Sequence, residues 1–233
     1  MKIYYRISNN SNKKNRLPYA TKEHCLENFL KHFHRPENSI LILADNVTEV
    51  PLAEFLKAKT CANITLEQTA LGNAGSFRHL LAKACDEIRD EEFVYFAEDD
   101  YLYTDNAYPI LLEGLHIANY ATLYDHPDKY VESHLGGNPM ICGGGEVTRL
   151  VITNSSHWKL TNSTTGTFGT NGKIIREDRD VWLAYSDKTP VFDYHGFCEL
   201  IQNKNRTLIS SVPGRATHCD LPWISPLTDW STV

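Results

Sequence analysis

Three consecutive carboxylates, Glu98, Asp99 and Asp100, follow directly on an apolar, aromatic and β-branched run at residues 93–97. Such a run is typical of a buried strand in a parallel sheet with both faces covered. Unpaired charges at its end would be costly to desolvate, and no basic cluster follows them in the sequence. A divalent cation that holds a phosphorylated ligand is the simplest partner, since Mg²⁺ and Mn²⁺ prefer hard oxygen ligands. An acidic turn that faces water is the alternative.

Strand and helix signals alternate over the first hundred residues that lead to this triplet. The predicted strands cover residues 3–7, 39–44, 64–68 and 93–97, and the predicted helices cover residues 21–34, 51–59 and 76–89. This order predicts an α/β fold with a mostly parallel, right-handed wound sheet flanked by helices. Ligands of open α/β sheets bind at the carboxyl ends of strands, which is where the acidic triplet lies.

The second half of the chain has a less regular pattern, with glycine-marked loops around residues 136–145. Strand candidates are residues 121–124, 147–153, 166–169 and 207–212, and helix candidates are residues 108–119, 176–185 and 194–203. Acidic residues at the start of the helix at 176–185 suit its amino-terminal dipole. No internal repeat, coiled coil or clear linker is visible, so we expect a single domain over residues 1–233.

Composition excludes several classes of protein. The 233 residues carry a formal net charge of −6, which argues against a nucleic-acid partner. No signal peptide or transmembrane segment is recognisable, and the six scattered cysteines form no CxxC pair, which suits free thiols in a reducing compartment. We therefore expect a cytoplasmic protein.

The order of the motifs resembles that of family 2 type glycosyltransferases with the GT-A fold. A strand ends in Asp45, a Gly-Asn-Ala-Gly turn at residues 72–75 leads into a helix, and the next strand ends in Phe-Ala-Glu-Asp-Asp. The resemblance continues to Glu177-Asp178 and covers most of the chain. It implies that residues 1–104 bind a nucleotide-diphosphate sugar and that residues 105–233 bind the acceptor.

The resemblance implies several donor-binding residues. Asp45 would accept a hydrogen bond from the nucleobase, although acids are also ordinary turn formers. Asn73 and Gly75 match an Asn-x-Gly element whose backbone N–H groups would meet ligand oxygens, although an ordinary turn fits as well. The family often has an Arg-Asn pair further along this helix, which the chain lacks. Arg78 could supply the cation one turn earlier, or it could lie on a solvated helix face.

The triplet itself matches the family's metal-binding acidic motif. Asp100 is the first choice as a direct ligand of Mn²⁺ or Mg²⁺, while Glu98, on the same strand face, would hold ribose or a metal-bound water. Asp99 is included in the donor site. The triplet begins with Glu where the family has Asp. The metal would neutralise the charge on the leaving nucleoside diphosphate.

A late histidine often completes the metal site in enzymes of this fold, and His218 stands in a suitable place. Its rivals are His195 and His134, and a lone histidine is more often structural. The aromatic residues Trp158, Tyr124 and Trp223 could stack on a sugar or simply be buried. A basic loop could approach the diphosphate or remain solvated; it contains Lys13, Lys14 and Arg16.

The resemblance places the catalytic base in an acidic pair at a helix start. Asp178 is the expected base, which would remove the proton of the acceptor hydroxyl, with Glu177 and Asp180 as alternates. Acids in a first helical turn also stabilise the helix dipole without any catalytic purpose.

Together these features predict a metal-dependent hexosyltransferase or related glycosyltransferase of glycan biosynthesis. It would move a sugar from a nucleotide-diphosphate sugar, with UDP favoured, to a hydroxyl acceptor with inversion. A nucleotidyltransferase of the same broad fold is one alternative, although residues 8–12 contain no glycine where those enzymes have a Gly-rich loop. A non-catalytic nucleotide- or sugar-binding module is the other, and it would tolerate loss of Asp178.

Overall fold

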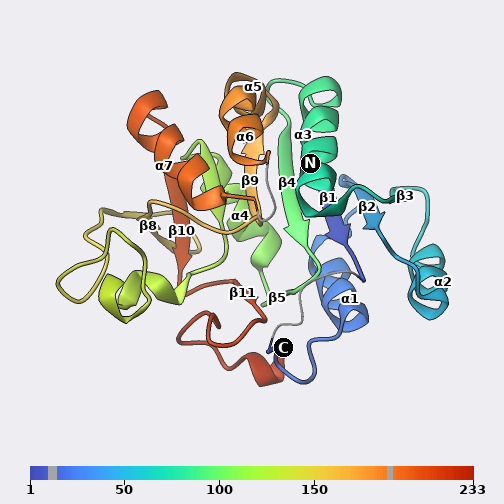
Figure 1. Ribbon diagram of the computed structural model, residues 1–233, viewed down its shortest axis with the longest axis horizontal. Coiled ribbons are helices and arrows are strands. Elements are labelled where there is room, and N and C mark those ends of the chain that lie inside the picture. The colour runs from blue at the N-terminus through green and yellow to red at the C-terminus, as the bar shows by residue number, and fades with distance from the viewer. Residues whose placement is uncertain (10–14, 188–190) are drawn as a thin grey trace.

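A nine-stranded sheet runs through the whole chain, as a computed structural model shows for residues 1–9, 15–187 and 191–233 (Figure 1). The strand order is β3-β2-β1-β4-β9-β6-β10-β8-β7. Helices cover both faces of this sheet (Figure 1). The predicted α/β fold with a mostly parallel sheet flanked by helices is therefore confirmed.

The first half of the chain forms the elements that the sequence predicts. Its strands β3, β2, β1 and β4 pair in parallel, so their carboxyl ends meet at one edge of the sheet. The elements are β1 (Lys2–Ile7), α1 (Lys22–Phe33), β2 (Ser39–Asp45), α2 (Val50–Ala58), β3 (Ile64–Thr69), α3 (Gly72–Glu87) and β4 (Phe93–Glu98). Helix α3 begins four residues before the predicted start at Ser76 because the Gly72–Gly75 segment, expected to be a turn, is its first turn.

The second half has shorter elements, several of which the sequence does not reveal. They are β5 (Tyr101–Tyr103), α4 (Ala107–Leu115), β6 (Tyr120–Thr122), β7 (Leu150–Ile152), β8 (His157–Leu160), β9 (Phe168–Asn171), α5 (Gly172–Glu177), α6 (Arg179–Tyr185), α7 (Asp193–Lys204), β10 (Leu208–Val212) and β11 (Ala216–His218). Strand β9 runs antiparallel between β4 and β6, which reverses the direction of the chain there. The chain therefore leaves β9 at the amino-terminal edge of the parallel strands.

One predicted helix differs from the structure in a way that matters for the site. Residues 176–185 belong to two helices, α5 and α6, which meet at Asp178. The start of α5 is set earlier, where the Asn171 side chain accepts a hydrogen bond from the Ile174 N–H. Asp178 is the N-cap residue of α6, as expected of an acid at a helix start, whereas Glu177 is the last residue of α5.

The core lies in two layers, one on each face of the sheet. Alternate residues of β1 show this, because Ile3 and Tyr5 pack with α1, α2 and α4 while Tyr4 packs with α3 and α5–α7. On the second face, Trp182 stacks on Phe168 with ring centroids 5.0 Å apart. No helix within the described ranges is long and apolar enough to cross a membrane.

Candidate active site

The acidic triplet lies at the carboxyl edge of the parallel strands, where β4 ends and the chain turns into β5 (Figure 1). The structure supplies a different protein cation for each of its three carboxylates. The sequence had suggested a divalent cation as the simplest partner of these charges, and the structure shows that Arg6, Arg16 and Lys22 of the chain itself also compensate them. The cations precede the triplet in the chain by 77 to 92 residues, so no local pattern reveals them.

Glu98 is held by Arg6 of the neighbouring strand β1. The Arg6 guanidinium forms an ion pair with the Glu98 carboxylate and also donates to the Asn73 carbonyl at 2.6 Å and to Ser76 Oγ at 3.2 Å. Gly166 approaches Glu98 from the other side, since a Cβ there would lie 2.9 Å from Glu98 Cδ. The guanidinium thus joins the end of β4 to the first turn of α3.

Asp99 is buried against the first strand and the first helix. Its carboxylate accepts the Ser8 backbone N–H at 2.9 Å and forms an ion pair with Lys22 of α1. Burial raises the pKa of Asp99, as does the neighbouring charge of Asp100, while Lys22 lowers it. The role of this side chain in the structure is to tie β1 and α1 to the end of β4.

Asp100 is the meeting point of three distant segments. Its carboxylate lies 3.1 Å from Arg16 Nη2 and 3.1 Å from His218 Nε2, and its carbonyl accepts the Cys219 N–H at 2.8 Å. The small antiparallel sheet of β5 and β11 brings His218 opposite Tyr101. Of the three histidines considered from the sequence, His218 is the one that this pairing places beside the triplet.

Asp100 and His218 offer a hard carboxylate oxygen and an imidazole nitrogen, a donor pair that suits Mn²⁺ or Mg²⁺. No group of three or more His, Cys, Asp or Glu side chains is placed to hold a metal ion in the part of the chain that the structure describes. The expected third ligand, Glu98, is engaged by Arg6 instead. The two donors thus fit a divalent ion only as a half-site, with further oxygen ligands supplied by diphosphate or water.

A further acid near the triplet, Asp193, was not predicted from the sequence. It lies at the first turn of α7, where the charges of Glu98 and Arg6 both act on it. Burial, and then the Glu98 charge, raise the pKa of Asp193 to about 7. The only signal in the sequence is an acid directly before the predicted helix at 194–203.

Asp45 orders the loop between β3 and α3. Its buried carboxylate accepts the backbone N–H groups of Leu71 at 2.6 Å and Gly72 at 2.9 Å, the Thr69 hydroxyl at 2.9 Å and the Asn46 amide at 2.8 Å. These bonds cap α3, which has no side-chain cap of its own. The geometry matches the reading of Asp45 as a turn acid.

The start of α3 lies beside the triplet through Arg6. Asn73 is exposed and presents its carbonyl to Arg6, while a Cβ at Gly75 would lie only 3.0 Å from Leu71 Cβ. Arg78 is exposed and forms no salt bridge with any described residue. Arg6, rather than Arg78, therefore supplies the guanidinium at the start of α3. In the sequence, Arg6 is recognisable as a lone charged residue within an apolar strand.

Asp178, the expected base, lies at the amino-terminal end of the parallel strands, whereas the triplet lies at their carboxyl end. The chain reaches α5 from the amino-terminal end of β4, and α5 and α6 lie at the far end of the sheet from β5 and β11 (Figure 1). The Asp178 carboxylate is fully buried and accepts Tyr120 Oη–H at 2.8 Å, Arg206 Nε–H at 2.8 Å and Arg206 Nη2–H at 2.9 Å. Glu177 is drawn into the same ion pair with Arg206 at 2.7 Å. The structure thus places these two acids away from the acidic triplet, in a contact with Arg206.

The predicted aromatic and basic residues fall into three groups. Trp158 is buried in the core, where it packs on Gly114. Tyr124 and Trp223 lie near the site, because Tyr124 is 6.4 Å from the His218 ring and its hydroxyl donates to the Trp223 carbonyl at 2.5 Å. Lys13 and Lys14 lie outside the described residues.

Comparison with known proteins places the fold. No family model and no curated protein sequence matches the chain. A structure from Desulfovibrio desulfuricans, assigned as a nucleotide-diphospho-sugar transferase, matches with a TM-score of 0.50 at 13% identity, over 90% of this chain and 78% of that one. The galactosyltransferase LgtC, solved with donor and acceptor sugar analogs, matches with a TM-score of 0.47 at 14% identity, over 85% of this chain and 69% of that one. S. aureus TarS (residues 1–349) matches with a TM-score of 0.49 at 16% identity, over 89% of this chain and 58% of that one. At these identities the likeness shows the fold, which is that of the nucleotide-diphospho-sugar transferases.

Proposed function

We propose that this protein is a glycosyltransferase that moves a sugar, a hexose or a related one, from a nucleotide-diphosphate sugar, with UDP favoured, to a hydroxyl group of a glycan or another acceptor. The observation that carries the proposal is the meeting of Asp100 with His218, 118 residues further along the chain, at the carboxyl edge of the parallel sheet. Ligands of open α/β sheets bind at this edge. The fold shared with a nucleotide-diphospho-sugar transferase supports the choice of donor.

Donor binding would use the two ends of the triplet differently. Asp100 and His218 would hold Mn²⁺ or Mg²⁺, which neutralises charge on the diphosphate when bound. Arg16, which faces Asp100 at 3.1 Å, would supply a second cation for the phosphate oxygens. Glu98 and Asp99 are tied to Arg6 and Lys22, so they would keep the edge in shape rather than bind the ion.

The nucleoside would lie over the loop between β3 and α3. The Asp45 carboxylate fixes this loop by accepting hydrogen bonds from the loop's backbone N–H groups. In base recognition, Asp45 would therefore shape the surface that the base contacts. Asn73, at the exposed start of α3, is the polar side chain nearest to this surface along the chain.

Proton transfer would fall to Asp193 in place of Asp178. Asp193 lies at the same edge as the triplet, and its raised pKa places its ionisation close to neutral pH, which suits a general base. A carboxylate that takes the proton of an acceptor hydroxyl during one displacement would invert the anomeric configuration.

The test is a screen of UDP-, GDP- and CMP-sugars with Mn²⁺, in which release of the free nucleotide is measured for the wild type and for Asp100→Asn. The proposal expects release from one donor class, lost in the variant, and a product whose anomeric configuration is inverted by NMR. Release of pyrophosphate from a nucleoside triphosphate would point to nucleotidyl transfer instead. Failure of every nucleotide to bind would contradict both activities.

A further inference from the structure

Strand β7, the last strand on one side of the central sheet, lies in an exposed apolar surface that the proposed reaction does not use. It surrounds the edge strand β7 and consists of Ile117, Met140, Val147, Arg149, Leu150 and Ile152, which we call the β7 patch. Val147 is 98% exposed, Ile152 70% and Leu150 64%. Aliphatic side chains exposed together to this extent mark an interaction surface.

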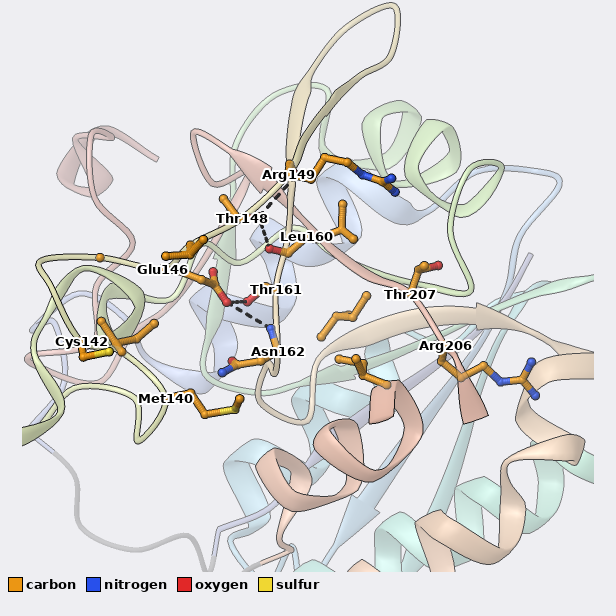
Figure 2. Close-up of a pocket in the computed structure, with 15 residues that line it drawn as sticks. Met140, Cys142, Glu146, Thr148, Arg149, Leu160, Thr161, Asn162, Arg206 and Thr207 are labelled. Atoms are coloured by element: carbon orange, nitrogen blue, oxygen red, sulfur yellow. Dashed lines mark hydrogen bonds between the residues drawn. The ribbon is translucent and has the colours of Figure 1, made fainter. Parts of the chain in front are cut away.

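Two adjoining grooves make the β7 patch continuous. The larger, of about 470 Å³, lies beside Met140 and Val147, and the smaller, of about 260 Å³, lies beside Ile117 and Ile152. Arg149 and Leu160 line both grooves. Figure 2 shows Met140 and Cys142 on one side of the larger groove and Arg149 on the other. Leu150 and Ile152 alternate with Arg149 and Val151 along β7, so the patch wraps around the sheet edge.

The other edge strand of the sheet, β3, carries charged side chains, which keep a free edge from pairing with another chain. There, Glu67 of β3 pairs with His79 at 2.6 Å and with Lys83 at 3.3 Å. The β7 edge has no such charged cover, since Arg149 forms no salt bridge within the described part of the chain and its strand neighbours Leu150 and Ile152 are apolar. An apolar edge strand without such charges presents a surface to which a partner can bind.

The charge of the β7 patch indicates which partner covers it. No Asp or Glu occurs from Val147 to Arg176, although the whole chain has a net charge of −6. Glu146, which lines the larger groove, is turned to Thr161 and to the backbone of Asn162. Two copies of the patch brought face to face would place Arg149 opposite its own counterpart. An anionic bilayer complements both the cation and the aliphatic side chains.

We propose that the β7 patch docks on the surface of an anionic lipid bilayer, with Val147, Leu150 and Ile152 in the boundary between head groups and acyl chains and Arg149 on the lipid phosphates. The active-site edge of the sheet lies elsewhere, so the inference is independent of the proposed reaction.

Vesicle cosedimentation of the full chain at low salt tests the inference. Phosphatidylcholine vesicles are compared with phosphatidylcholine vesicles that contain phosphatidylglycerol. We expect binding to the anionic vesicles at least about tenfold tighter than to the neutral ones, and a loss of about fivefold in Arg149→Gln. The triple variant Val147→Ser, Leu150→Ser, Ile152→Ser loses most of the binding.

The matched control removes exposed aliphatic side chains outside the β7 patch. Val50 is 70% exposed and Leu227 87%, so the double variant Val50→Ser, Leu227→Ser should bind as the wild type does. The inference is overturned if the folded wild type does not sediment with anionic vesicles, or sediments equally with neutral ones. It is also overturned if light scattering shows a dimer that the triple variant dissociates, because the patch then joins two copies of the chain.

Discussion

The two edges of the central sheet each hold a buried aspartate beside an arginine, but they differ in what surrounds the pair. At the amino-terminal edge, Asp178 is 0% exposed, and both of its oxygens accept hydrogen bonds from Arg206 while Tyr120 adds another. At the carboxyl edge, Asp100 meets Arg16 and His218 in a row of three carboxylates. The first pair is a closed structural contact, whereas the second lies among three carboxylates and the cations that face them.

The difference teaches that an acidic motif takes its role from its partners rather than from its own residues. Glu177-Asp178 and Asp99-Asp100 are both acidic pairs in the sequence. Asp99-Asp100 follows strand β4, and Glu177-Asp178 stands at the junction of α5 and α6. The charge of Asp178 is neutralised by Arg206 at the junction of α5 and α6. Both carboxylate oxygens therefore already have hydrogen-bond donors within the protein.

Removal of the carboxylate at the amino-terminal edge should cost stability and leave the site intact. Asp178→Ala removes the buried partner of Arg206 and leaves this guanidinium beside the exposed Glu177, so we expect the free energy of unfolding in urea to fall by about 3–5 kcal/mol. Nucleotide binding by the protein that remains folded should be unchanged. The double variant Asp178→Leu, Arg206→Met is the control, since an apolar pair should recover most of the loss; abolished binding in folded Asp178→Ala would return this acid to the site.

Removal of the carboxylate charge at the carboxyl edge should have the reverse effect. In Asp100→Asn we expect release of nucleoside diphosphate from the donor to fall by about 10²–10³-fold, because the divalent ion that would neutralise the leaving diphosphate loses its carboxylate ligand. Thermal unfolding should change less than in Asp178→Ala. Normal turnover in this variant would show that Asp100 is a surface acid.

Asp193 should control the pH dependence of the reaction. A base must be ionised, so the rate should rise with pH through an apparent pKa of about 7 and should lose this limb, with a fall of about 10²-fold, in Asp193→Asn. The pKa is raised in the folded state, so stability should decrease as the pH rises from the ordinary carboxyl range towards 7. Urea unfolding of both proteins across this range measures that slope, and an equal slope in Asp193→Asn would contradict the assignment.

Two glycines offer the finest test, because each lies against one edge. A Cβ at Gly166 would lie 2.9 Å from Glu98 Cδ, so Gly166→Ala should lower turnover by about tenfold through displacement of that carboxylate. A Cβ at Gly172 would lie 2.2 Å from the Arg89 carbonyl, so Gly172→Ala should lower the free energy of unfolding by about 1–3 kcal/mol with turnover retained. Equal effects of the two variants on turnover would remove the distinction between the edges.

Much of the first half of the fold could be predicted because its strands and helices are long enough to show their periods. Strands β5 and β11 have three residues each, too few for a pattern, although they are the elements that bring His218 to Asp100. The triplet is a local feature and was found, whereas Arg6 and Lys22 were not, because an ion pair across 92 or 77 residues leaves no local trace. The separation of Asp178 from the triplet could not be predicted, because a local acidic pair does not show at which end of the parallel strands the chain returns.

The most direct test of the carboxyl-edge site is a calorimetric titration of UDP, GDP and CMP, with and without Mn²⁺, into the wild type and Asp100→Asn. We predict that one nucleotide binds the wild type, that Mn²⁺ tightens this binding, and that the tightening is lost in Asp100→Asn. No binding of any nucleotide to the folded wild type in the presence of Mn²⁺ would contradict it.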